Sequence, residues 1–187
     1  LHVRDFVHLP EEIHALFAVG PWVDTGRELL QQAVASPLFV LACIAFLVLV
    51  WMRAMLSTRL EQAVTLAGNP ATYHFVLPLQ ALGLTVLLAL PLPLLFFTVG
   101  WLLHNLSEAS EFSRSVGGAL VLLATRLFYL RSFIVLLRPI GIATRIFFWP
   151  KATVNLLRRE TGRFLLAFPP MVFFTQLAFY VNYRAGA

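Results

Sequence analysis

The sequence predicts an all-α, polytopic membrane protein: a helix bundle of about four transmembrane helices with interfacial amphipathic helices beside them. Of its 187 residues, 59% are hydrophobic and only 12% are charged, about half the charged fraction of a typical soluble domain. Apolar runs of about 20 residues recur, and that length crosses a 30 Å hydrocarbon core. A water-soluble fold of this composition would expose large apolar patches, so we expect lipid as the solvent.

Residues 1–36 form the first predicted unit, an amphipathic approach segment on or near the membrane surface. A proline followed by two glutamates at positions 10–12 predicts the start of a helix. The glycine and proline at positions 20–21 are expected to break the chain. Asp24 is then expected to cap a second short helix that ends near Ala35.

Residues 37–187 form the predicted transmembrane domain. Its expected spans are residues 37–56, 76–103, 116–137 and 164–183. The second run has 28 residues and would be about 42 Å long as a straight helix, so it must tilt or bend. Pro91 and Pro93 are expected to bend it, because each removes a backbone hydrogen bond and clashes with the preceding turn. These prolines are therefore hinge candidates, with a static kink as the alternative.

Aromatic and basic residues near the ends of the spans are candidate anchors. Trp101 marks the far end of the second span, at headgroup level. Gly117 and Gly118 open the third span, where another helix can approach closely. Residues 142–163 combine aromatic and basic side chains and predict an interfacial helix that contacts anionic lipids. The candidate lipid and interface anchors are Trp101, Arg126, Arg131, Arg138, Arg145, Phe148, Trp149, Lys151, Arg158 and Arg159.

Two readings remain open for these anchors. Arg126 lies near the middle of the third span, where a lone charge costs at least about 2.5 kcal/mol. It either contacts a lipid phosphate or another helix in a tension-dependent way, or it snorkels or pairs with backbone carbonyls. Phe148 and Trp149 either form an ordinary aromatic belt or couple bilayer thickness to helix tilt.

The distribution of charge predicts the orientation. One set of loops carries eight basic and two acidic residues, and the opposite set carries four basic and seven acidic residues. The basic side is expected to be cytoplasmic, so residues 1–36 and the last residues would both be periplasmic. The net charge of +5 then reflects topology and contact with anionic lipid headgroups rather than binding of nucleic acid.

Several functional classes lack support in the sequence. No aspartate or glutamate falls inside an expected span, which argues against intramembrane aspartyl proteases and carriers that use a buried carboxylate. The five histidines and the single cysteine, Cys43, have no metal-ligand spacing. We therefore predict neither enzyme activity nor a cofactor or metal.

Two groups of motifs resemble a known family. The similarity covers about residues 37–185, and the chain resembles the inner-membrane domain that precedes the pore in large small-conductance-type mechanosensitive channels, the potassium-regulated, KefA-like branch. The first group is Gly83-Leu84-Thr85 to Pro91-Leu92-Pro93, Gly100-Trp101-Leu102-Leu103, and Phe112 with Gly117-Gly118-Ala119-Leu120. The second is Leu137-Arg138-Pro139 with Gly141, then Phe148-Trp149-Pro150 and Leu156-Leu157-Arg158-Arg159.

The resemblance implies a homo-oligomeric ring in the bacterial inner membrane that opens under tension and releases ions and small osmolytes during osmotic shock. The present chain would supply peripheral helices, because the family's Gly/Ala-rich pore helix and its β-rich vestibule have no counterpart in this sequence. Two alternatives stay open. One is part of a secondary transporter, a class in which kinked helices are common, and the other is a membrane anchor or assembly scaffold for a periplasmic domain.

Overall fold

The computed structural model describes residues 19–68, 75–105 and 110–185. These ranges are helical and contain no strand, which confirms the all-α prediction. The helix expected from residues 10–12 lies outside the described residues. The helices are α2 (Val19–Ala35), α3 (Pro37–Trp51), α4 (Arg53–Ala67), α5 (Val76–Ala89), α6 (Pro91–Asn105), α7 (Glu111–Leu136), α8 (Ile142–Arg145) and α9 (Lys151–Ala185).

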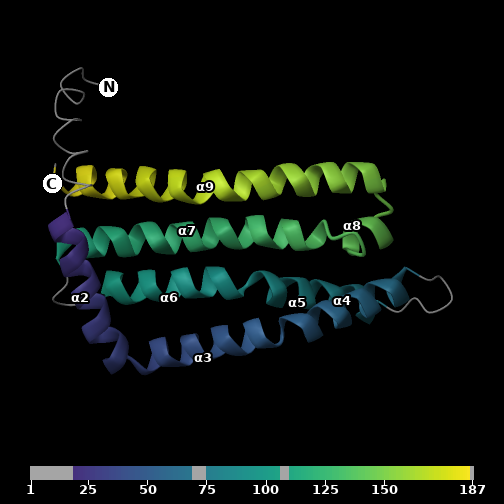
Figure 1. The fold of residues 1–187 in the computed structure, drawn as a ribbon, viewed down its shortest axis with the longest axis horizontal. Helices are drawn as coiled ribbons and strands as arrows, with labels where there is room; N and C mark the ends of the chain where they lie inside the picture. Colours follow the sequence, from purple (N-terminus) through teal and green to yellow (C-terminus); the bar gives the residue numbers. More distant parts are fainter. Residues whose placement is uncertain (1–18, 69–74, 106–109, 186–187) are drawn as a thin grey trace, which may run out of the picture.

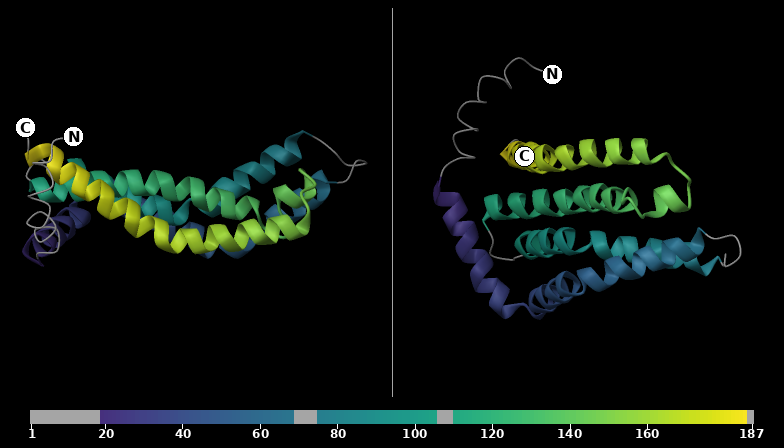
Figure 2. Two further views of the ribbon diagram at one scale, coloured as in Figure 1. Left: turned by 90° about the horizontal axis from the view of Figure 1, so that it is seen from above. Right: turned by 45° about the vertical axis from the view of Figure 1, so that its right-hand side comes forward.

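The long helices form a layer, and α4 and α5 overlap at one end of it in Figure 1. Figure 1 shows α9, α7, α6 and α3 side by side, with α5 continuing α6 and α4 continuing α3; the turned view in Figure 2 shows the same order. Helix α7 packs between α6 and α9, and α3 packs on α6. The most apolar stretch of α9 is only 6% buried within the chain. Both broad faces of the layer are therefore available to lipid or to other subunits.

Length and apolar composition allow two to four membrane crossings. Helices α7 and α9 each qualify alone, and the pairs α3–α4 and α5–α6 qualify if each bent pair counts as one span. This agrees with the expected bundle of about four spans. Helix α2 and the end of α9 lie at the same end of the layer, while α8 and the α4–α5 hairpin lie at the other (Figure 1).

Two local predictions about helix boundaries were wrong. Helix α2 begins at Val19 and continues through positions 20–21, because a proline in the first turn loses no intrahelical bond. The chain therefore does not break there, and Asp24 lies inside the helix rather than capping it. The interfacial helix expected over residues 142–163 is also not one separate element: Arg145 ends the short helix α8, and the other basic residues of this stretch belong to α9, which continues to Ala185.

Helix α2 lies across one end of the layer and is held by aromatic and polar contacts (Figure 1). The ring of Trp22 lies 5.2 Å from that of Phe112 on α7 and 6.3 Å from that of Phe173 on α9, centroid to centroid. The Thr25 and Ser113 hydroxyl oxygens are 2.8 Å apart and share a hydrogen bond. These contacts attach the approach segment to both long helices.

Candidate functional site

The first part of the candidate site is a bend between α5 and α6 at the predicted prolines. The two helix axes differ by 54° across Leu90. The backbone N–H of Leu90 still bonds to the carbonyl of Val86 (3.0 Å), and that of Leu94 bonds to Leu90 (2.9 Å). Pro91 and Pro93 have no N–H to donate, so the helix is weakened between these bonds. The bend falls where the sequence predicted it.

A second bend, of 58°, separates α3 from α4 at Met52. No proline or glycine lies there, and this bend was not predicted. The available signal is a change in composition: α3 is apolar on all sides, whereas α4 carries Arg53, Arg59 and Glu61. The charged helix α4 bends away from the axis of the apolar helix α3 near the expected end of the first span.

Helices α4 and α5 form a hairpin between the two bends. Its core contains Leu60 and Val64 of α4 and Ala81 and Ala89 of α5, all buried. The same cluster reaches Val135 of α7 and Ile142 of α8. The hairpin is thus one packed unit that rests on the end of α7 and is joined to the rest of the layer by two bent connections.

Beyond the bend, α6 is held tightly against α7 by glycines. A Cβ atom added to Gly117 would lie 2.6 Å from the backbone nitrogen of His104 and 2.7 Å from the carbonyl oxygen of Gly100. A Cβ on Gly100 would lie 2.7 Å from the Gly117 carbonyl oxygen. Neither position can carry a side chain unless the helices move apart. The close approach predicted at Gly117 is confirmed, whereas its partner Gly100 was not predicted.

An apolar cavity of about 250 Å³ lies beside the proline bend. Leu90, Pro93, Leu94 and Phe97 line it from one side, and Ala124, Thr125 and Phe128 of α7 line it from the other. Because the cavity sits where α5 and α6 change direction, it leaves room for side chains to rearrange if the bend angle changes.

A side-chain hydrogen bond joins the hairpin to the end of α7. Arg138 follows α7, is half-buried, and donates from Nη1 to the hydroxyl oxygen of Ser57 on α4 at 2.5 Å. Burial is the main cause that lowers the pKa of Arg138, and the nearby charge of Arg53 lowers it further. Arg138 was a predicted anchor, but its partner Ser57 was not foreseen.

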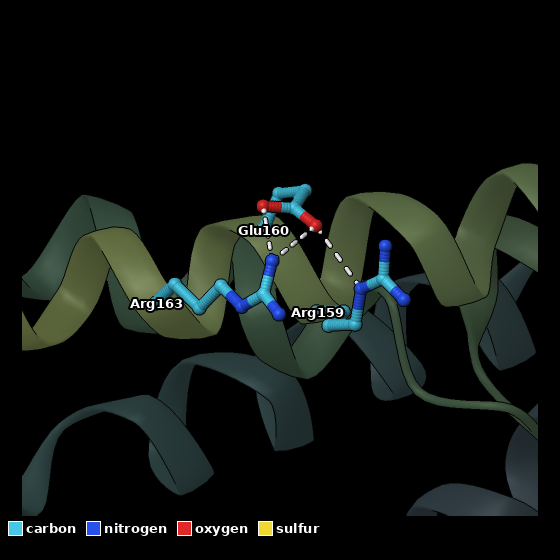
Figure 3. Close-up of polar contacts among 3 residues, drawn as sticks. All are labelled: Arg159, Glu160 and Arg163. Carbon is cyan, nitrogen blue, oxygen red and sulfur yellow. Dashed lines mark hydrogen bonds and ion pairs between the residues drawn. The ribbon is translucent and has the colours of Figure 1, made fainter.

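The remaining basic anchors at this end are exposed. Arg145, Lys151, Arg158 and Arg159 all present exposed side chains on α8 and the first turns of α9. Figure 3 shows Arg159 and Arg163 on either side of Glu160, with nitrogen–oxygen distances of 3.0 and 3.1 Å. Such exposed ion pairs contribute little to stability, so these residues remain available for contact with headgroups.

The other predicted anchors are spread over the layer. Arg126 is exposed near the middle of α7, and Arg131 is half-buried one and a half turns later. Trp101 is exposed near the end of α6. Phe148 and Trp149 are exposed in the link before α9, where Phe148 has a positive φ of 55°. These residues therefore do not meet at one site.

The sequence of this layer matches a family model over residues 36–185, the mechanosensitive ion channel inner membrane domain 1. The chain belongs to this family. Neither a curated protein nor a solved structure matches it. The match begins at Ser36, whose side chain caps α3, so it includes both bends and the hairpin of this channel domain. The family is a channel domain and not an enzyme family.

Proposed function

We propose that this channel domain is the peripheral tension-sensing module of a bacterial mechanosensitive channel of the potassium-regulated branch, active in protection from osmotic shock. The observation that carries the proposal is the α4–α5 hairpin between two bends of 58° and 54°. Membrane tension favours whichever arrangement occupies more area in the bilayer plane, and a force shifts an equilibrium only through such a difference between states.

The geometry of the hairpin supports a large difference in area. Helix α5 has 14 residues and is therefore about 21 Å long. At a bend of 54°, it projects about 17 Å sideways from the axis of α6. A straightened helix would lose this projection if α6 and α7 stand along the membrane normal. Tension would then favour the bent arrangement.

The exposed faces of the layer support its place at the edge of a homo-oligomeric channel. Only 6% of the most apolar stretch of α9 is buried within the chain, so this helix needs further cover. In the proposed arrangement, neighbouring subunits and anionic lipids supply that cover. The protein would lie in the inner membrane of a bacterium. The basic end of the layer, with α8 and the start of α9, would face the cytoplasm, and both ends of the chain would face the periplasm.

Patch-clamp recording of the full-length channel tests the proposal. Removal of residues 37–185 should change the tension at half-maximal opening, and light scattering of the purified protein should show whether the oligomer persists. An intact oligomer with an unchanged threshold would refute tension sensing. Loss of the oligomer, with unchanged tension response in the channels that still form, would instead support the scaffold alternative.

A further inference from the structure

Three arginines gather where α4 meets the end of α7. Arg138 reaches α4 through its hydrogen bond to Ser57. Arg53 lies four residues before Ser57 in α4, so both are on the same face of that helix. Arg131 is half-buried in the last turns of α7, seven residues before Arg138 in the chain. The Arg138–Ser57 contact thus brings the end of α7, with Arg131 and Arg138, to the face of α4 that carries Arg53.

In the part of the chain that the structure describes, no carboxylate forms an ion pair with these arginines. The charge of Arg53 acts on both Arg131 and Arg138, and the charge of Arg158 on α9 also acts on Arg138. Glu61 is the acid that acts on Arg138, but within the described ranges the ion pairs shorter than 4 Å both involve Glu160 on α9. Like charges at partly buried positions are unfavourable unless an anion compensates them.

The position of the cluster indicates which anion is available. Trp51 ends α3, two residues before Arg53, and 86% of it is exposed. An exposed indole at the end of an apolar helix is typical of the headgroup level of a bilayer. The abundant anion at that depth is the phosphodiester of a lipid, and guanidinium groups bind phosphate through paired, charge-assisted hydrogen bonds.

We propose that Arg53, Arg131 and Arg138 form a binding site for the phosphate of an anionic lipid, which bridges the α4–α5 hairpin to the end of α7. The site differs from the dispersed anchors because its members come from two parts of the chain that the Arg138–Ser57 hydrogen bond joins. Its role in holding the hairpin in the bent arrangement rests on the proposed function. Binding of the lipid itself does not.

Native mass spectrometry of the full-length protein, titrated with phosphatidylglycerol or phosphatidylcholine, tests the site. The double variant Arg53→Gln with Arg138→Gln should lose at least about tenfold in phosphatidylglycerol affinity, because two charged hydrogen-bond donors are removed. The matched control, Arg27→Gln with Arg59→Gln, removes the same charge from exposed positions that are neither in the site nor among the predicted anchors. It should stay within about twofold of the native affinity.

Three outcomes would overturn the site: equal losses in the two double variants, equal affinity of the native protein for the two lipids, or full displacement of the lipid by equimolar inorganic phosphate. Arg53→Gln alone keeps the test valid if loss of Arg138 impairs folding, since Arg53 is exposed; it should also weaken binding. If the lipid binds as expected but the tension threshold is the same in both lipids, the site stands and the sensing role fails.

Discussion

Replacing the two prolines at the α5–α6 bend is the most direct test of the hinge. The double variant Pro91→Ala with Pro93→Ala restores two backbone donors and removes two clashes. A proline in a helix interior costs about 3 kcal/mol, so relief of even one such cost shifts the equilibrium towards a straight helix by about a hundredfold. If the bent arrangement is favoured by tension, the variant should open at higher tension.

The change in geometry is large enough to measure. Spin labels at Leu79 on α5 and Tyr129 on α7 would sit at exposed positions, in a background with Cys43, the single cysteine, replaced by alanine. Position 79 lies about 16 Å along the helix from the bend. Complete loss of a 54° bend would therefore move it by about 15 Å, which double electron–electron resonance resolves.

Pro78 supplies the matched control on the same helix. It lies in the first turn of α5, where a missing N–H costs no intrahelical bond. Pro78→Ala should therefore leave both the label distance and the tension threshold unchanged. If the double variant at the bend also shows the native distance and threshold, the bend is a static kink and the hinge hypothesis is refuted.

Three further predictions concern the contacts around the hairpin. Gly117→Leu should separate α6 from α7 and lower the thermal stability of the detergent-purified protein, whereas Gly83→Leu, which faces open space, should not; equal effects would contradict the close contact. Trp22→Ala should weaken docking of α2 by about 2 kcal/mol, seen as faster hydrogen exchange in that helix. Ser57→Ala removes the acceptor of Arg138 and should speed exchange in α4 by about fivefold, while unchanged exchange would show that the bond does not hold the hairpin.

Features with local causes could be predicted from the sequence. The apolar runs predicted membrane helices because their length and composition alone show that they need lipid, not water, as solvent. Pro91 and Pro93 predicted the bend, since proline acts on the turn that contains it. Gly117 predicted a close helix contact because a residue without a side chain lets another helix approach its backbone. In each case, the residue itself carries the property that produces the structure.

Features that depend on distant parts of the chain could not be predicted in this way. The break at Met52 has no proline or glycine, and Met52 packs against the core of the hairpin, so tertiary contacts contribute to that position. Ser57 has no distinctive pattern in the sequence, and becomes significant only because the fold places it 2.5 Å from the guanidinium of Arg138. The length of α9 was missed because aromatic and basic residues suggested a separate interfacial helix.

If the α5–α6 bend acts as the proposed hinge, the lipid solvent explains how it can move. In water, moving the hairpin away from Val135 and Ile142 would expose apolar surface and carry the full hydrophobic cost. In a bilayer, lipid tails replace those contacts, so separation of apolar helix faces has no hydrophobic penalty of that kind. The apolar core of the hairpin therefore fixes its internal packing without fixing its angle to α7. Control of that angle falls to the backbone at Pro91 and to the polar contacts at Arg138, which lipid tails cannot replace.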